Sequence, residues 1–251
     1  MAAGYNPHVH RFYAPDFAPD GLFELPPDEA QHLVRVLRLR AGGEIAVFDG
    51  TGREALARIE SVTNRRVTVR ATGARAAAAE PRVAVTLAQA LLKSDKMDRV
   101  IRDAVMLGVA AIQPLASRRT DVPMSATKKG GRQERWHRTV IASVKQCGRA
   151  VVPPVNATRD LSELLRSNQE TRLMFVEPGS RHTVGDVTSL EGQQPSNVTV
   201  FIGPEGGWDP SEIAAAAQAG VTLLSFGQRV LRADAAAAAI LPVLRYIWRD
   251  L

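Results

Sequence analysis

The sequence predicts two domains, a small β-rich domain followed by a larger α/β domain with a mostly parallel sheet. Up to about residue 72, short segments alternate apolar and polar residues with turn signals between them. From residue 82 onward, apolar strand-like runs alternate with helical patterns, which is typical of a parallel sheet covered by helices. The chain has 251 residues and 45% hydrophobic composition, enough to bury a substantial core in one large or two smaller domains.

The β-rich domain is expected over residues 1–72, and its pattern suits a small barrel or a sandwich. One helix interrupts the strands at residues 26–39, where Pro27 and Asp28 suit a first turn and Leu33 and Leu37 recur at helical spacing. Residues 73–81, GARAAAAEP, lack any period and are expected to be the interdomain linker. The expected strands are 43–50, 54–61 and 65–72.

The α/β domain is expected over residues 82–251. Strands buried inside a parallel sheet are apolar on both faces, and the segments VTVFI and VTLLSF come close to that pattern. The expected strands are 83–91, 111–115, 172–177, 198–202 and 221–226, and the expected helices are 94–108, 132–148, 161–167, 209–220 and 233–249.

Composition favours a cytoplasmic protein without a membrane span. The longest apolar run, residues 235–244, is ten residues long and contains Pro242, whereas a spanning helix needs roughly 20. The N-terminal residues lack the apolar core of a secretory signal, and the single Cys147 cannot form an internal disulfide. The five histidines are scattered without the spacing of a metal site, so no metal is expected.

Positive charge is concentrated in the middle of the chain. Residues 81–150 contain 14 Lys and Arg against 5 Asp and Glu, whereas the two flanking parts are close to balance. This distribution suits a polyanionic partner such as RNA, although solvated helix faces would give the same pattern. Half of these cations are Arg118, Arg119, Lys128, Lys129, Arg132, Arg135 and Arg138.

A glycine-rich loop, GPEGGW at residues 203–208, follows the expected strand 198–202. Ligands of open α/β sheets bind beyond the carboxyl ends of strands, and glycines allow the backbone to approach them closely. The next helix has a well-specified start, because Asp209 can cap it, Pro210 suits its first position and Glu212 completes a capping box. The loop therefore predicts a binding site lined by backbone.

Two familiar nucleotide sites are excluded for this loop. It lacks the GK[ST] ending of a phosphate loop, and its central glutamate would repel phosphates. No GxGxxG follows any expected strand either. What remains is a pocket for a neutral or cationic small molecule.

The second unusual loop is FGQRVLR at residues 226–232, which follows the expected strand 221–226. Val230 and Leu231 suit an apolar slot, while Arg229 or Arg232 suits an anionic partner. Asp234 then falls in the first turn of a helix, where the helix dipole favours a carboxylate. The structural alternative is that this loop packs under the sheet and its arginines pair with Asp or Glu, but the position of both loops at one sheet edge favours a functional site.

These residues are similar to a known family. GPEGGW with its capping Asp-Pro-Ser-Glu, followed by FGQRVLRAD, resembles the signature of the RsmE-type 16S ribosomal RNA uridine-N3 methyltransferases of the SPOUT superfamily. Residues 32–52 resemble the family's N-terminal PUA-like barrel, residues 93–120 its first βαβ unit and residues 145–153 an internal motif. The chain departs from the family pattern at Met106, at Lys145 and Cys147, and at Asp234, which keeps a carboxylate where the family has Glu.

The resemblance implies a SPOUT-type α/β domain with a C-terminal trefoil knot at about residues 198–240, preceded by a PUA-like β-barrel that binds RNA. It implies a homodimer that uses S-adenosylmethionine to methylate N3 of a decoding-region uridine in the 16S ribosomal RNA of the small ribosomal subunit. The implied cofactor-binding residues are Glu177, Gly203, Pro204, Glu205, Gly206, Gly207, Phe226, Gly227, Gln228, Val230, Leu231 and Arg232.

For catalysis, we expect Arg232 to stabilise the uracil anion and Glu205 to oppose the sulfonium charge, while no residue suits a general base. Transfer to a ring nitrogen needs no covalent adduct, so Cys147 is interpreted as structural. Two alternatives stay open, a non-catalytic RNA-docking factor of ribosome assembly and a SPOUT methyltransferase that acts on transfer RNA or a ribose 2′-hydroxyl. The expected RNA contacts are His32, Arg35, Arg38, Arg40, Lys93, Lys96, Arg118 and Arg119.

Overall fold

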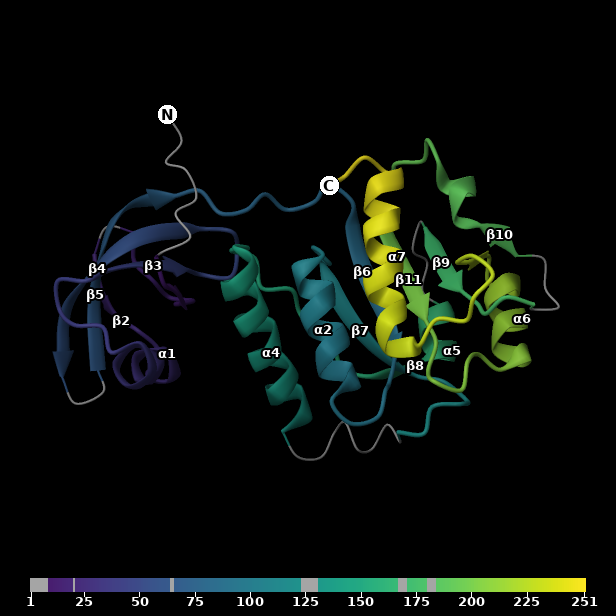
Figure 1. Cartoon of the computed structure of the whole chain (residues 1–251), viewed down its shortest axis with the longest axis horizontal. Coiled ribbons are helices and arrows are strands. Elements are labelled where there is room, and N and C mark those ends of the chain that lie inside the picture. The colour runs from purple at the N-terminus through teal and green to yellow at the C-terminus, as the bar shows by residue number, and fades with distance from the viewer. Residues whose placement is uncertain (1–8, 20, 64–65, 123–130, 167–170, 180–183) are drawn as a thin grey trace. The chain divides into compact units, whose positions relative to one another are not determined.

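The computed structural model describes residues 9–19, 21–63, 66–122, 131–166, 171–179 and 184–251 (Figure 1). The chain forms two compact units. The first unit comprises residues 1–80 and 144–152, and the second comprises residues 81–143 and 153–251. Two lysines of the basic segment, Lys128 and Lys129, and two of the five histidines, His8 and His182, lie outside the described residues.

The first unit is built on a five-stranded mixed sheet with the order β1-β3-β4-β5-β2. Strand β1 pairs in parallel with β3, whereas β3 with β4, β4 with β5 and β2 with β5 pair antiparallel. The three longer strands match the predicted segments, although β5 continues into the expected linker. Strands β1 and β2 were not predicted, because each has only three residues and shows no clear alternation. The bounds are β1 Arg11–Tyr13, β2 Leu22–Glu24, β3 Glu44–Phe48, β4 Glu54–Thr63 and β5 Arg66–Arg75.

The single helix expected in the first unit has two parts. Helix α1, Pro27–Gln31, has proline at its start and acidic residues in its first turn, and it passes into a π-helical segment η1, His32–Leu37. Arg38 then ends the segment in the left-handed conformation with φ of 53°. Leu33 points into the core of this unit, together with Phe12, Leu25, Ile45, Val47, Ile59, Val67 and Val69.

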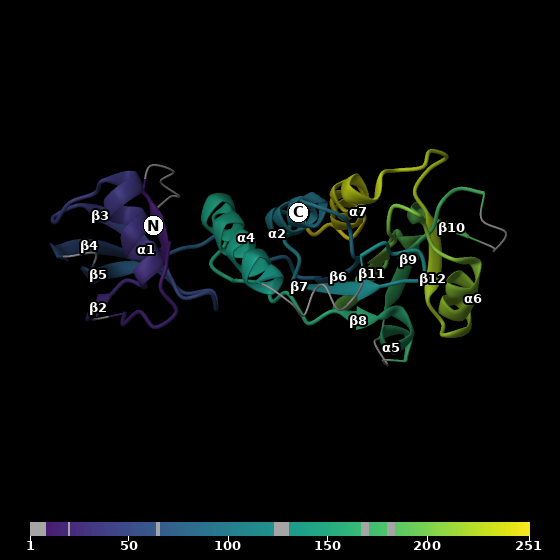
Figure 2. The ribbon, with the colours of Figure 1, turned by 90° about the horizontal axis from the view of Figure 1, so that it is seen from below.

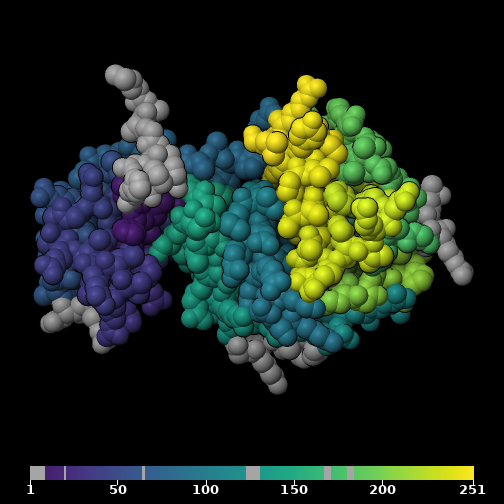
Figure 3. All heavy atoms as spheres, viewed as in Figure 1, coloured from purple at the N-terminus to yellow at the C-terminus, as the bar shows by residue number. Residues whose placement is uncertain are grey.

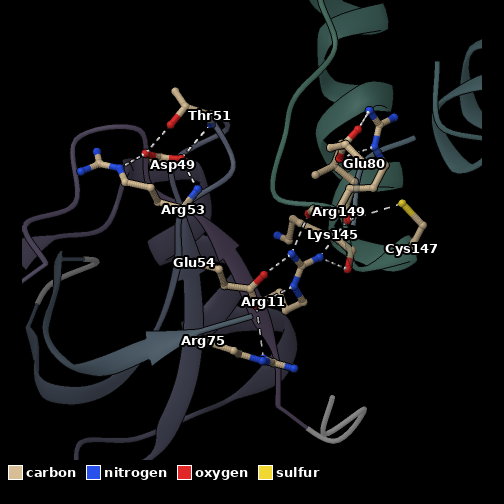
Figure 4. Close-up of polar contacts among 11 residues, drawn as sticks. Arg11, Asp49, Thr51, Arg53, Glu54, Arg75, Glu80, Lys145, Cys147 and Arg149 are labelled. Atoms are coloured by element: carbon tan, nitrogen blue, oxygen red, sulfur yellow. Dashed lines mark hydrogen bonds and ion pairs between the residues drawn. The ribbon is translucent and has the colours of Figure 1, made fainter. Parts of the chain in front are cut away.

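A buried cluster of charges joins the sheet of the first unit to residues 144–149 (Figure 4). The guanidinium of Arg11 donates to both carboxylate oxygens of Glu54, at 2.7 and 3.1 Å, and Arg75 lies 3.4 Å from the same carboxylate. Arg11 also donates to the carbonyl oxygens of Val144 and Arg149, at 2.8 and 2.6 Å. Because both charged side chains of the Arg11–Glu54 pair are at most 5% exposed, the pair is shielded from solvent.

Residues 144–152 therefore belong to the first unit, although the sequence placed them among the α/β elements. Lys145 pairs with Glu29 at 2.7 Å, and Arg149 donates to Glu80 at 2.9 Å. Val151 forms isolated β-bridges with Gly50 and Thr51. These are contacts between residues distant in sequence, so local periodicity could not reveal them.

The second unit contains a seven-stranded sheet with the order β10-β12-β9-β11-β6-β7-β8, in which all neighbouring strands are parallel. The five strands expected from the sequence are all present, and the two-residue strands β8 and β10 were too short to predict. The bounds are β6 Ala84–Ala90, β7 Ala111–Ala116, β8 Arg159–Asp160, β9 Arg172–Phe175, β10 Gly185–Asp186, β11 Asn197–Ile202 and β12 Thr222–Ser225.

Helices cover both faces of this sheet (Figure 2). Helices α2 and α7 pack side by side on one face, and α5 and α6 lie on the other. In the space-filling view, α7 and α2 form adjacent parts of one exposed surface (Figure 3). The bounds are α2 Lys96–Met106, α4 Arg132–Cys147, α5 Leu161–Leu165, the 3-10 helix η2 Val187–Leu190, α6 Pro210–Gln218 and α7 Ala233–Ile247.

Asp250 is hydrogen-bonded to the two residues that precede β6. The Asp250 carboxylate accepts hydrogen bonds from the backbone N–H groups of Arg82 and Val83, at 2.8 and 2.9 Å, and from Arg245 at 2.7 Å. The same Arg245 guanidinium donates to the Val83 carbonyl at 2.6 Å. Across the described parts of the chain, no helix combines the length and the apolar character needed to cross a membrane.

Candidate functional site

The order of the strands brings three loops together at one edge of the sheet. Strand β9 lies between β11 and β12, so the residues after it lie between the glycine-rich loop 203–208 and the loop 226–232. All three strands run parallel, and their carboxyl ends therefore meet at the same edge. Ligands of open α/β sheets bind at this edge.

A cavity of about 370 Å³ opens at this edge, within the range of small-molecule sites. Its lining comes from the ends of β9, β11 and β12, the start of α2 and the first turns of α7. Of the twelve expected cofactor residues, Gly206, Gly207, Gly227 and Gln228 are outside the lining. The other eight line it, namely Glu177, Gly203, Pro204, Glu205, Phe226, Val230, Leu231 and Arg232.

Part of the cavity wall is apolar. Phe175 ends β9, Ile202 ends β11, and Ile240 comes from α7. Phe226 meets the ring of Phe175 edge to face, with the centroids 6.5 Å apart and the planes at 68°. Such a wall suits the face of a planar, weakly polar group.

The glycine-rich loop needs its glycines for close packing. A Cβ on Gly203 would lie 3.2 Å from the indole of Trp208, whose Nε1–H donates to the Phe175 carbonyl at 2.9 Å. Gly207 has φ of +66°, and a Cβ there would overlap the carboxylate of Glu177. The loop is therefore held against the end of β9 on one side, and its backbone faces the cavity through Gly203 and Pro204.

The start of α6 anchors the other side of the same loop. The predicted capping box is present, because the Asp209 side chain accepts from Ser211 N–H and Glu212 accepts from Asp209 N–H, each at 3.0 Å. Glu212 also accepts from the backbone N–H of Arg118 at 2.9 Å. Arg119 donates to the Gly206 carbonyl at 3.3 Å, so the loop after β7 supports the glycine-rich loop.

Glu205 is an ionised carboxylate at the rim of the cavity. Partial burial disfavours its charge, but hydrogen bonds from Lys96 and from backbone N–H groups outweigh that cost and hold the pKa of Glu205 below its usual value. The Lys96 ammonium lies 3.0 Å from its Oε1. Lys96, which was expected from the sequence to contact RNA, lines the cavity and forms an ion pair with Glu205.

Asp234 is the second carboxylate at the rim. Its side chain is 6% exposed, and burial disfavours the charge, yet the hydrogen bonds and positive charge of Arg232, with Arg99 adding to them, lower its pKa. The Arg232 guanidinium binds both oxygens of Asp234 through Nε and Nη2, at 3.0 and 3.2 Å. Arg232 is nevertheless 74% exposed and lines the cavity, as the expected role at the substrate requires.

The expected RNA contacts divide between the two units. Arg118 and Arg119 are exposed in the second unit, where Lys93 forms a surface pair with Asp121 at 2.7 Å. His32, in the first unit, meets the ring of Phe12 with centroids 6.4 Å apart, which is a packing contact. Arg35, Arg38 and Arg40 are exposed on the same unit, at and after η1.

Sequence reasoning included Lys96, at the start of α2, only as an RNA contact, and it missed the other contributions of α2 and α7 to the site. Ala233, Ala236 and Ile240 of α7 line the cavity, and Arg99 of α2 reaches Asp234. The spacing of Lys96 and Arg99, three residues apart on one helix face, was the available signal. Among the described residues, no group of three or more His, Cys, Asp or Glu side chains is arranged to hold a metal ion.

Two family models and several known proteins match this chain. Residues 79–245 match the family model of an RNA methyltransferase domain, and residues 25–72 match that of an RNA methyltransferase PUA domain. The ribosomal RNA small subunit methyltransferase E of Synechocystis is 30% identical over 222 residues, which cover 88% of this chain and 71% of the relative. The enzyme of the same name from Bacillus subtilis is 24% identical, covering 89% of this chain and 90% of the relative.

A solved structure extends the similarity to the fold. Ribosomal RNA small subunit methyltransferase E from Neisseria gonorrhoeae, bound to S-adenosyl methionine, superposes with a TM-score of 0.86 at 30% identity. The similarity covers 96% of this chain and 98% of that one. The chain thus belongs to the ribosomal RNA small subunit methyltransferase E family, a family of RNA methyltransferases.

Proposed function

We propose that this protein transfers a methyl group from S-adenosylmethionine to N3 of a decoding-region uridine in 16S ribosomal RNA. The cavity at the carboxyl ends of β9, β11 and β12 carries this proposal, because it is lined by eight of the residues that the family resemblance assigns to the cofactor. The relative from Neisseria gonorrhoeae, which shares the fold, is bound to S-adenosyl methionine. Membership of the methyltransferase E family supports the choice of ribosomal RNA.

We propose that the methyl donor lies between the two loops. The apolar wall of Phe175, Ile202 and Ile240 suits the adenine ring, and the backbone of Gly203 and Pro204 suits its polar edge. The proposed cofactor residues Gly206, Gly207 and Gly227 do not line the cavity and act by letting the two loops take their shape. Gln228 does not line the cavity either and stays a proposed cofactor contact.

The reaction is a displacement at the methyl carbon. The bond from sulfur to methyl breaks as the bond from N3 to methyl forms, sulfur keeps the electron pair, and the N3 proton passes to solvent. Holding donor and acceptor in line supplies much of the rate, since well-oriented groups reach effective molarities on the order of 10⁵ M or more. We propose that Arg232 stabilises the uracil anion and that the charged Glu205 favours the sulfonium.

The proposed partner is the 16S ribosomal RNA of the small ribosomal subunit, in the cytoplasm. We propose residues 1–72 as a PUA-like barrel that binds RNA, joined by residues 73–81 to the methyltransferase domain 82–251. Strand β5 runs three residues into the joining segment, and residues 144–152 pack with the first unit. The family-model match at residues 25–72 supports this role. The proposed RNA contacts are His32, Arg35, Arg38, Arg40, Lys93, Lys96, Arg118 and Arg119.

We further propose that residues of about 198–240 form a trefoil knot and that the protein is a homodimer with the cofactor site beside the subunit interface. Exposed apolar side chains support an interface, with Met106 of α2 39% exposed and Tyr246 of α7 72% exposed. Val230 of the second cofactor loop is 70% exposed as well. Light scattering at micromolar concentration would show twice the chain mass if the dimer forms.

Mass spectrometry of ribosomal RNA nucleosides tests the function. A strain that lacks the gene should lose 3-methyluridine from 16S RNA, and the wild-type gene should restore it. A gene encoding Arg232→Ala should restore little of it if Arg232 stabilises the anion. Unchanged 3-methyluridine in the deletion strain, or loss of a different modified nucleoside, would contradict the proposed substrate.

A further inference from the structure

Helix α2 contacts both cofactor loops through two cations. Lys96 and Arg99 stand three residues apart, and neighbours at this spacing lie on the same face of a helix. Lys96 pairs with Glu205 of the glycine-rich loop at 3.0 Å. Arg99 pairs with Asp234, directly after the second loop, at 3.4 Å.

Asp234 is the centre of the second contact. Its carboxylate is 6% exposed and is shared between Arg99, from α2, and Arg232, from the rim of the cavity. Arg232 is the N-cap residue of α7, with extended backbone angles of −64° and 140°, and it lines the cavity. A buried carboxylate with two guanidinium partners thus lies beside a rim arginine.

An exposed arginine loses conformational freedom when it must act at one place. A guanidinium that is already fixed has less rotamer entropy left to lose when substrate binds. The Asp234 contacts use the Nε–H and one Nη2–H of Arg232, two of the five N–H donors of a guanidinium. Three N–H groups remain for a substrate oxygen.

We propose that Asp234 is a positioning residue that fixes the guanidinium of Arg232 toward the bound uracil, and that Arg99 holds Asp234 in place. This inference rests on the proposed function for its catalytic consequence. Asp234 acts on the reaction through Arg232, although its own carboxylate also lines the cavity. The purely structural alternative is that Asp234 merely stabilises the start of α7 through the helix dipole.

A double-mutant cycle separates the two roles. If Asp234 acts through Arg232, Asp234→Asn lowers kcat about 10- to 100-fold in the wild-type background but less than about 2-fold in an Arg232→Ala background. Asp234→Glu, which keeps the carboxylate, should recover most of the rate. Arg99→Met should lower kcat in the same direction, while Arg102→Met, which removes an exposed arginine one turn further along α2, should leave it unchanged.

The same variants are followed by a readout that needs no activity. The Nε–H resonance of Arg232, observed by ¹⁵N NMR, should show an ordered side chain in the wild type and increased mobility in Asp234→Asn and in Arg99→Met. The affinity for S-adenosylmethionine should change less than about 3-fold, and the melting temperature shows whether each variant is folded. If Asp234→Asn does not fold, the kcat and the Arg232 Nε–H resonance of Arg99→Met test the proposal instead.

Two results would overturn the proposal. One is an equal loss of kcat from Asp234→Asn with and without Arg232, and the other is an Arg232 resonance that is equally ordered in all variants. If the wild-type protein methylates no RNA, the proposed function fails, and the NMR comparison alone decides whether Asp234 orders Arg232.

Discussion

The carboxylate of Glu177 occupies the space that a side chain at residue 207 would need. Gly207 has φ of +66°, and a Cβ built on it would lie 2.9 Å from Cδ of Glu177. This contact joins the end of β9 to the glycine-rich loop that follows β11. Two of the acidic side chains that line the cavity, Glu177 and Glu205, therefore have different surroundings, one against a glycine backbone and the other beside Lys96.

Gly207→Ala should weaken S-adenosylmethionine binding by about 10-fold or more, because a methyl group there must displace Glu177 from the cavity wall. Gly220→Ala is the matched control. Gly220 has φ of +75°, with nothing within 4 Å of a built Cβ. It should cost about 1–2 kcal/mol of stability through backbone strain alone and leave the affinity unchanged. Titration calorimetry of both variants checks the prediction, and equal affinities would refute it.

Glu54→Gln should destabilise the first unit by about 3–5 kcal/mol, because it removes the buried negative charge that faces the guanidinium groups of Arg11 and Arg75. Glu60→Gln, on the same strand β4, removes an exposed pair with Arg70 and should cost less than about 1 kcal/mol. Hydrogen exchange of the β3, β4 and β5 amides measures both changes. Similar effects of the two substitutions would show that the buried cluster does not stabilise this unit.

Asp250→Asn should destabilise the second unit by about 3 kcal/mol at neutral pH, because it removes the buried negative charge that faces the Arg245 guanidinium. Burial disfavours the Asp250 charge, but backbone N–H groups and Arg245 outweigh it and lower the pKa of Asp250. A lowered folded pKa gives stability that is present above the unfolded value of about 3.9 and is lost as pH falls through the folded value. The stability difference between wild type and variant should therefore shrink below about pH 4, as measured by denaturant titrations at several pH values. A difference that stays constant from pH 7 to pH 3 would contradict this assignment.

Arg35→Gln should weaken RNA binding and reduce the slope of log affinity against log salt by about 1, as expected for the loss of one phosphate contact. Arg35 is exposed on η1 of the first unit. Arg159→Gln is the control, since Arg159 is exposed at β8 and pairs with Glu163 of α5 at 3.2 Å. Filter binding to a 16S RNA fragment at several salt concentrations measures both variants. Equal slopes of log affinity against log salt for the two variants would show that Arg35 does not contact the RNA.

Local sequence signals were sufficient for the elements that form the site. The apolar run before residue 203 predicted β11, and Asp209, Pro210 and Glu212 predicted the start of α6, which the structure confirms. Periodicity also predicted α2 and α7, because each has an amphipathic or continuous apolar pattern over more than ten residues. These features depend on residues close together in the chain.

Other features depend on contacts that no local pattern records. The position of β9 between β11 and β12 places Glu177 beside Gly207, and strand order follows from the packing of the whole sheet. The assignment of residues 144–152 to the first unit depends on Arg11, more than 130 residues away. The π-helical turn at His32–Leu37 and the sharing of Asp234 between two arginines likewise required the structure.

Calorimetric titration of S-adenosylmethionine into the folded protein measures whether this chain binds the methyl donor. We predict saturable binding of one molecule per chain that is weakened in Gly207→Ala and retained in Gly220→Ala. No heat of binding at several temperatures, from protein whose circular dichroism and melting transition show it to be folded, would contradict it.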